Sequence, residues 1–115
     1  MQIRIIKTPI TKEELKEIAE EGFGDLVKAV VDIYRGIMAL GGELHADEEA
    51  MLLENDSAQS NLWGINLYPE LKGDDFIEFD SMINLRPAVG NRSRGVENEE
   101  TRTQIREVVT KLITD

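Results

Sequence analysis

Residues 26–40 read LVKAVVDIYRGIMAL, and this stretch decides the fold class. Polar and apolar side chains alternate over residues 28–33, which is typical of a half-buried β-strand. The segment Ile37–Leu40 is a continuous apolar run that suits a buried strand, and Tyr34-Arg35-Gly36 predicts a tight connection between the two. The stretch therefore predicts two consecutive strands of a sheet.

Four other segments carry strand signals on either side of this stretch. They are Ile3–Lys7, Ala50–Glu54, Leu62–Tyr68 and Phe76–Arg86. Phe76–Arg86 alternates most cleanly, and we expect it to form one strand. Because no helical crossover separates the middle strands, most of them are expected to pair antiparallel. For Asp47–Glu54 the alternative of a short helix capped by Asp47 stays open.

Two helices are predicted, one near each end of the chain. Thr11 stands three residues before Glu14 in the capping-box pattern, and a helix over residues 12–21 follows. Near the other end, Asn98 has the side chain of an N-cap. Apolar residues then recur at the spacing of an amphipathic helix, at Ile105, Val108, Val109, Leu112 and Ile113.

These elements indicate an α+β protein. We expect a mostly antiparallel sheet of about five to six strands, with the N-terminal and the C-terminal helix packed on one face. The chain has 115 residues and shows no repeat or linker, so residues 1–115 are expected to form a single domain.

The composition excludes several classes of function. Lys and Arg number 13, and Asp and Glu number 23. The resulting net charge of −10 repels a phosphate backbone, so we expect no nucleic-acid binding. The chain has no cysteine, hence no thiolate nucleophile and no cysteine-ligated zinc, and it has a single histidine. No signal sequence or membrane-spanning stretch is visible. We therefore expect a cytoplasmic protein that does not bind a membrane.

A first candidate site lies in residues 43–47, which read ELHAD. If this segment is extended, Glu43, His45 and Asp47 share one face, because alternate residues of a strand project together. Such a set could hold a divalent metal such as Mn²⁺, Fe²⁺ or Zn²⁺, or arrange a general acid and base. Glu48 and Asp80 are further oxygen ligands in this hypothesis. The alternative is a solvated polar strand edge.

A second candidate is the cationic loop that follows the last predicted strand. Arg86 and the run Asn91-Arg92-Ser93-Arg94-Gly95 place three arginines and no acid between residues 86 and 96. This segment carries +3 in a chain whose net charge is −10. Arginine side chains and glycine-rich backbone amides suit carboxylate or phosphate oxygens. In the alternative, the arginines pair with the protein's own carboxylates.

A third candidate is the polar face of the last predicted strand, which we expect beside Asn66. Acid, amide and guanidinium groups on this face could line a ligand cleft whose rim carries Arg92 and Arg94. The same face could be solvated or form a dimer interface, so a homo-oligomer stays open. The members of this face are Glu78, Asp80, Asn84 and Arg86.

Four strings of the sequence resemble the signature of one family. They are GGELHAD (41–47), LWGINLYP (62–69), INLRP (83–87) and GNRSRG (90–95). Together they resemble a small prokaryotic domain family of unknown function, over nearly the whole chain. The resemblance implies a self-contained prokaryotic single-domain protein and supplies no activity, cofactor or catalytic residue.

The sequence favours a binding module for a small anionic ligand or for a protein partner's carboxylates. Removing Arg92 or Arg94 is then expected to abolish binding. One alternative is a metal-assisted hydrolase of a phosphate ester or anhydride that holds its divalent metal with Glu43, His45 and Asp47. A second alternative is a structural or protein-interaction domain, marked by an exposed apolar patch. The expected ligand-binding residues are Arg86, Asn91, Arg92, Ser93, Arg94, Asn84 and Asp80.

Overall fold

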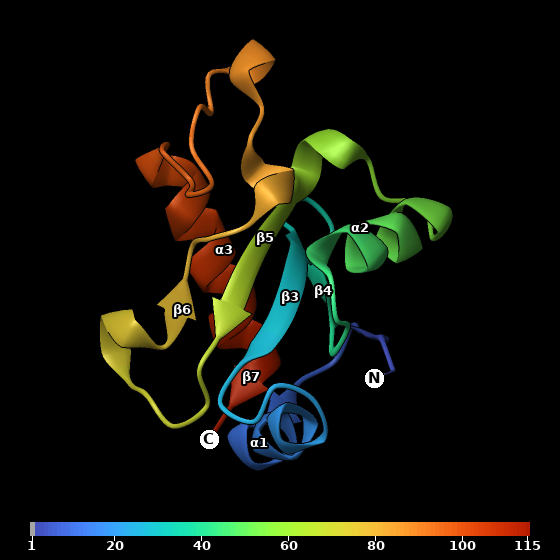
Figure 1. Cartoon of the computed structure of the whole chain (residues 1–115), viewed down its shortest axis with the longest axis vertical. Helices are drawn as coiled ribbons and strands as arrows, with labels where there is room; N and C mark the ends of the chain where they lie inside the picture. Colours follow the sequence, from blue (N-terminus) through green and yellow to red (C-terminus); the bar gives the residue numbers. More distant parts are fainter. Residues whose placement is uncertain (1) are drawn as a thin grey trace.

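The computed structural model describes residues 2–115 and shows the predicted α+β architecture (Figure 1). Within these residues, the main sheet is antiparallel throughout, in the order β1-β4-β3-β5-β6. Its strands are β1 (Arg4–Ile6), β3 (Val27–Asp32), β4 (Ile37–Leu40), β5 (Leu62–Leu67) and β6 (Ile77–Glu78). Two short strands, β2 (Ile10–Thr11) and β7 (Ile113–Thr114), pair in parallel. The helices are α1 (Lys12–Glu21), α2 (His45–Glu54) and α3 (Glu99–Leu112).

The turn between β3 and β4 is the tight connection that the sequence predicts. The carboxylate of Asp32 accepts hydrogen bonds from the backbone N–H groups of Tyr34 and Arg35, at 3.0 and 2.9 Å. Gly36 has a φ of 69°, a left-handed conformation that glycine adopts without steric penalty. Together these residues fix the register in which β3 and β4 pair.

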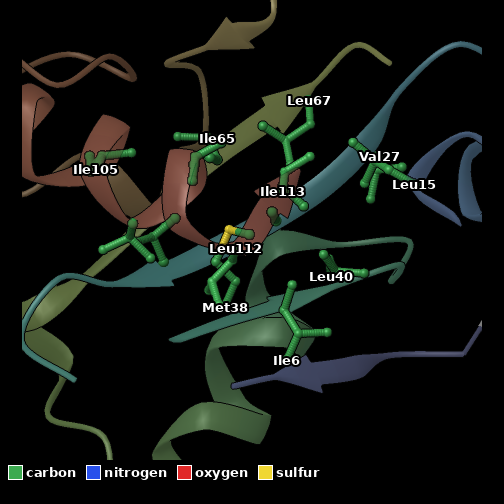
Figure 2. Packing of buried hydrophobic residues seen from close by; sticks show 14 of the residues in the cluster. Ile6, Leu15, Val27, Met38, Leu40, Ile65, Leu67, Ile105, Leu112 and Ile113 are labelled. Carbon is green, nitrogen blue, oxygen red and sulfur yellow. The ribbon is translucent and has the colours of Figure 1, made fainter. Parts of the chain in front are cut away.

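The helices α1 and α3 cover one face of the sheet, as predicted. Both begin at the predicted caps, where Thr11 accepts a hydrogen bond from the Glu14 N–H at 3.1 Å and Asn98 from the Thr101 N–H at 3.0 Å. Figure 2 shows how side chains of the helices and the sheet meet in one cluster. Its buried members include Leu15, Val27, Met38, Leu40, Ile65, Ile105 and Leu112.

The opposite face of the sheet is covered by α2, where the sequence predicted strands. Residues 47–54 lie in this helix, so the alternative of a helix over Asp47–Glu54 is confirmed, but the helix begins at His45 with Leu44 instead of Asp47 at its N-cap. The strand predicted for Ala50–Glu54 and the extended form of residues 43–47 are both wrong. Leu52 of α2 is fully buried against Val30, Ala39 and Leu62. An apolar sheet face needs a cover, and the short apolar run of α2 does not by itself distinguish a helix from a strand.

The strand predicted for Phe76–Arg86 is also wrong, since only Ile77–Glu78 pair with β5. Beyond β6 the chain leaves the sheet and forms short 3₁₀ turns at Met82–Asn84 and Pro87–Val89. It passes so close to Gly64 that a Cβ on this glycine would lie 2.5 Å from the Cβ of Ser81. We call residues 82–91 the arm, which projects beyond the sheet in Figure 1.

Side chains of the arm replace a strand along the outer edge of β5. Asn84 accepts a hydrogen bond from the Gly64 N–H at 2.8 Å and donates one to the Gly64 carbonyl at 2.9 Å. Arg86 donates to the carbonyl of Leu62. The backbone groups that a longer β6 would have paired are therefore satisfied by side chains. Residues with a strand-like alternation can therefore hydrogen-bond to the edge of β5 through their side chains without forming a strand themselves.

Asp56 is strained, and its replacement by glycine is expected to stabilise the protein. Within residues 2–115 it is the residue other than glycine with a positive φ, at 77°, and it follows the C-terminus of α2. We expect Asp56→Gly to raise the free energy of unfolding by about 0.5–1 kcal/mol, because glycine adopts this conformation freely. Urea unfolding measures the change. Asp75→Gly, at a position without positive φ, is the control, and an equal gain there would contradict this explanation.

Candidate functional site

A hollow of about 480 Å³ lies between the arm, the start of β5 and the N-terminus of α3. Its walls include Trp63, Arg86, Val89, Asn91 and Glu97. Two of these, Arg86 and Asn91, are among the predicted ligand-binding residues. The volume lies within the ~300–1,000 Å³ that small-molecule sites usually have.

The guanidinium group of Arg86 lies against the indole ring of Trp63, with Cζ 4.7 Å from the ring centroid. Its Nε donates to the Ile83 carbonyl at 3.1 Å, and its Nη2 donates to the Leu62 carbonyl. A Glu49 carboxylate oxygen lies 3.9 Å from Nη2. Burial lowers the pKa of Arg86 and Glu49 opposes this, but a guanidinium stays charged at neutral pH. The result is a half-buried cation held in one place.

Trp63 was missed as a site residue by the sequence argument. Its alternation with Ile65 and Leu67 predicts only a core position, and it does belong to the main core cluster. It also lines the hollow, although only 8% of its surface is exposed. Its indole Nε1 is buried without a hydrogen-bond partner, whereas a buried tryptophan N–H usually has one. Nothing in the sequence connects Trp63 with the distant Arg86.

Asn91 fixes the shape of the loop that closes one side of the hollow. Its Nδ2 donates to the carbonyls of Asn84 and Gly95, at 2.7 and 2.8 Å, and to that of Ser93 at 3.2 Å. Its Oδ1 accepts a hydrogen bond from the Glu97 N–H at 2.9 Å. Asn84 is fully buried, and its amide is also fully hydrogen-bonded to backbone groups, since its Nδ2 donates to the Arg94 carbonyl at 3.0 Å as well as to Gly64. Both amides hold the backbone rather than face an open site.

The remaining residues of the cationic loop are not among those that line the hollow. Arg94 forms an ion pair with Asp80, with its Nε 2.8 Å from a carboxylate oxygen. Ser93 accepts a hydrogen bond from the Gly95 N–H, and the Arg92 N–H donates to the Glu97 carboxylate at 2.7 Å. The alternative that the arginines pair with the protein's own carboxylates therefore describes Arg94, and Arg86 also lies 3.9 Å from the Glu49 carboxylate.

The residues of the third candidate, the polar face, do not lie on one face, because the chain leaves the sheet after Glu78. Asn66 and Glu78 do meet across β5 and β6, as expected, with the Asn66 Nδ2 donating to Glu78 at 2.9 Å. Tyr68 donates to the same carboxylate at 3.0 Å. Asn84, in contrast, turns inward to Gly64. These residues therefore form a polar network at the sheet edge and do not line one cleft.

The strand geometry behind the metal hypothesis is wrong. His45 is the first residue of α2 and Asp47 is its third, so the two residues do not share a strand face with Glu43. His45 is buried, its Nε2 donates to the Ile65 carbonyl at 2.8 Å, and burial lowers its pKa. Glu43 and Asp47 are exposed. Across residues 2–115, no group of three or more His, Cys, Asp or Glu side chains is arranged to hold a metal ion.

Comparison with known proteins identifies a family but no activity. A family model described as "Protein of unknown function (DUF5674)" matches residues 4–112. No curated protein and no solved structure matches the chain. None of the helices within residues 2–115 is both long and apolar enough to cross a membrane.

Proposed function

Because the chain belongs to this family of proteins of unknown function, we propose its function from geometry: a binding module that holds a small carboxylate with an apolar or aromatic body. The ligand occupies the hollow beside Trp63 and Arg86. The observation that carries the proposal is the half-buried guanidinium of Arg86, which is stacked on an indole at the wall of a ligand-sized hollow.

Arg86 has hydrogen-bonding capacity left for a ligand. Its Nε and Nη2 are bound to backbone carbonyls, which hold the group in place. Across residues 2–115, its Nη1 takes part in no hydrogen bond. Glu49, at 3.9 Å, is too far for a hydrogen bond of good geometry. A carboxylate in the hollow would form a charge-assisted hydrogen bond with Nη1, in a place where burial strengthens it.

The walls of the hollow favour a carboxylate over a phosphate. Trp63 and Val89 offer apolar surface, and Val89 is 71% exposed. The outward face of the guanidinium is suited to stack on a planar ring. Glu97 adds negative charge to the wall, and the whole chain has a net charge of −10. Both disfavour a doubly charged group more than a singly charged one.

Trp63 is the only tryptophan of the chain, so its fluorescence reports on the hollow directly. We expect benzoate to change this fluorescence in a saturable way, and phenyl phosphate and inorganic phosphate to bind more weakly. Val89→Asp places a carboxylate at the hollow and is expected to weaken benzoate binding about ten-fold, ~1.4 kcal/mol. Arg86→Lys, which keeps the charge and loses the planar fork, is expected to weaken it as well.

The control variants carry equivalent changes elsewhere. Tyr34→Asp adds the same charge as Val89→Asp at another exposed position, and Arg94→Lys changes the arginine that pairs with Asp80. Both are expected to bind benzoate as the unmodified protein does. No saturable response to benzoate, or equal weakening in the control variants, would reject the proposal.

A further inference from the structure

The sheet ends at β6, which is the last strand on this side (Figure 1). The Tyr68 N–H donates to the Phe76 carbonyl at 3.0 Å, and Asn66 is aligned with Glu78. In an antiparallel pair, backbone groups point alternately toward and away from the partner strand. The N–H and carbonyl groups of Ile77 therefore point away from β5. Within residues 2–115, no other strand pairs with this edge.

A groove of about 480 Å³ lies between this edge and the helix α3. Its apolar lining comes from both sides, with Phe76 and Phe79 beside β6 and with Val109 and Ile113 from α3 and β7. It has no lining residue in common with the hollow at Trp63. An open strand edge beside an apolar groove is the arrangement that binds an extended peptide by strand addition.

The charges along the groove differ between its two ends. At one end, Arg106 lies over the ring of Phe79, with Cζ 5.3 Å from the ring centroid. Its ion-pair partner Glu99 is 71% exposed and lies 3.7 Å away. Exposed pairs of this kind are weak, so Arg106 is available to a ligand.

At the other end of the groove, carboxylates outnumber the cation. Lys12 lies over the ring of Phe76, with Nζ 5.1 Å from the centroid, and pairs with Asp115 at 3.3 Å. Asp74 also lines this end. The groove therefore offers a positive charge beside Phe79 and a net negative charge beside Phe76.

We propose that this edge and groove bind an extended peptide that adds to β6 as an antiparallel strand. The peptide exchanges hydrogen bonds with the N–H and carbonyl groups of Ile77. An apolar side chain of the peptide fills the groove, and its neighbours two positions away lie on the same face. The N-terminal neighbour is acidic and meets Arg106, and the C-terminal neighbour is basic and meets Asp74.

A second copy of this chain fits the site less well than such a peptide. In an antiparallel pair of β6 strands centred on Ile77, Asp74 of each copy would lie opposite Asp80 of the other. Like charges directly opposite each other in a sheet are destabilising. Each copy also has a net charge of −10. A separate peptide with both signs of charge avoids this repulsion.

The test is an NMR titration of the full chain, labelled with ¹⁵N, with the peptide Ac-Thr-Asp-Thr-Phe-Thr-Lys-Thr-NH₂. We expect saturable shifts at the amides of Ile77 and Thr110, and slower hydrogen exchange of the Ile77 N–H. Replacing the central Phe of the peptide by Ser is expected to weaken binding about ten-fold. Exchanging its Asp and Lys is expected to weaken binding as well, because both charges then meet like charges.

Variants of the protein distinguish the groove from other surfaces. Thr110 is exposed on α3 and lines the groove, so Thr110→Tyr is expected to fill it and reduce binding while leaving the core intact. Gln104→Tyr, at an exposed position of the same helix outside the groove, is the control and is expected to bind normally. The fluorescence of Trp63 is expected to stay unchanged.

Three results would overturn the proposal. The first is the absence of saturable shifts at Ile77 and Thr110 with the Phe peptide. The second is equal binding of the Phe and Ser peptides, since the apolar groove would then contribute nothing. The third is a stable dimer of the chain alone, seen by light scattering, with the Ile77 N–H already protected from exchange. Slower exchange of Ile77 only when the peptide is present supports strand addition.

Discussion

Asn84→Ala is expected to lower the free energy of unfolding by about 3–5 kcal/mol, because it leaves both buried backbone groups of Gly64 without partners. The Asn84 side chain is fully buried and bonds to both backbone groups of Gly64 and to the carbonyl of Arg94. Alanine replaces none of these three hydrogen bonds, so both backbone groups of Gly64 lose their partner, whereas the Arg94 carbonyl still accepts from the Ser81 N–H at 2.9 Å. Each orphaned group keeps the cost of its removal from water, about 1–3 kcal/mol.

The measurement is chemical unfolding, with Asn98→Ala as the matched control. Asn98 is an exposed N-cap whose Oδ1 accepts hydrogen bonds from the Thr101 N–H at 3.0 Å and from the Thr101 hydroxyl at 3.4 Å, and its loss is expected to cost about 1 kcal/mol. Asn84→Asp is expected to be destabilising too, because a carboxylate cannot donate to the Gly64 and Arg94 carbonyls. If Asn84→Ala lost no more stability than Asn98→Ala, the amide of Asn84 would not be what closes the edge of β5.

Glu48→Gln is expected to stabilise the protein at neutral and alkaline pH. The Glu48 side chain is fully buried beneath the turn at Gly42, and burial raises its pKa from 4.5 to about 9. One oxygen accepts a hydrogen bond from the Gly42 N–H at 2.9 Å, and the other has no partner. Folding at pH 7 must therefore keep this carboxyl protonated, whereas the unfolded chain ionises it.

The pH dependence follows from the direction of this shift. Below about pH 4.5 the carboxyl is protonated in both the folded and the unfolded state, so its titration does not lower the free energy of unfolding. Between about pH 5 and pH 9 the unfolded state alone loses the proton, so stability falls by up to about 1.4 kcal/mol per pH unit. Glutamine keeps the acceptor for the Gly42 N–H and does not titrate. We expect Glu48→Gln to remove this slope, so that its gain in stability over the unmodified protein grows as the pH rises from 5 to 9.

Glu54→Gln is the control for this experiment, because Glu54 is an exposed residue of the same helix. It removes the same charge and is expected to leave the slope between pH 5 and pH 9 unchanged. Unfolding in urea at a series of pH values measures all three proteins. A Glu48→Gln variant with the slope of the unmodified protein would show that Glu48 is ionised in the folded state.

The elements specified by local signals could be predicted from the sequence. The caps at Thr11 and Asn98, the turn at Tyr34-Arg35-Gly36 and the apolar period of α3 all act within a few residues. Residues close together in the sequence therefore specify these elements without reference to distant partners. These signals were sufficient to predict two helices on one face of an antiparallel sheet.

The elements that depend on distant partners could not be predicted. The run at residues 47–54 is short, and it becomes a helix because it covers Val30, Ala39 and Leu62. The alternation of polar and apolar residues after Glu78 is typical of a strand. The polar side chain of Asn84, however, binds the backbone of Gly64, twenty residues earlier in the chain. An alternating pattern reports which side chains are buried or polar and does not report what they contact.

The same reasoning applies to the candidate site. The local excess of arginine indicated Arg86, which does line the hollow, but it also indicated Arg94, which pairs with Asp80. Trp63 carries no signal of its own, because a core tryptophan and one beside a ligand have the same neighbours in sequence. Sequence reasoning found the charge of the site and missed its aromatic wall.

The side chains that line the outer edge of β5 have a consequence for how the protein behaves at high concentration. An uncovered strand edge recruits strands from other molecules, and fibres grow from such contacts. Asn84 and Arg86 occupy the positions at Gly64 and Leu62 that a foreign strand would need. We therefore expect loss of Asn84 to make the chain a template for polymer growth, at protein concentrations where the unmodified chain does not form fibres.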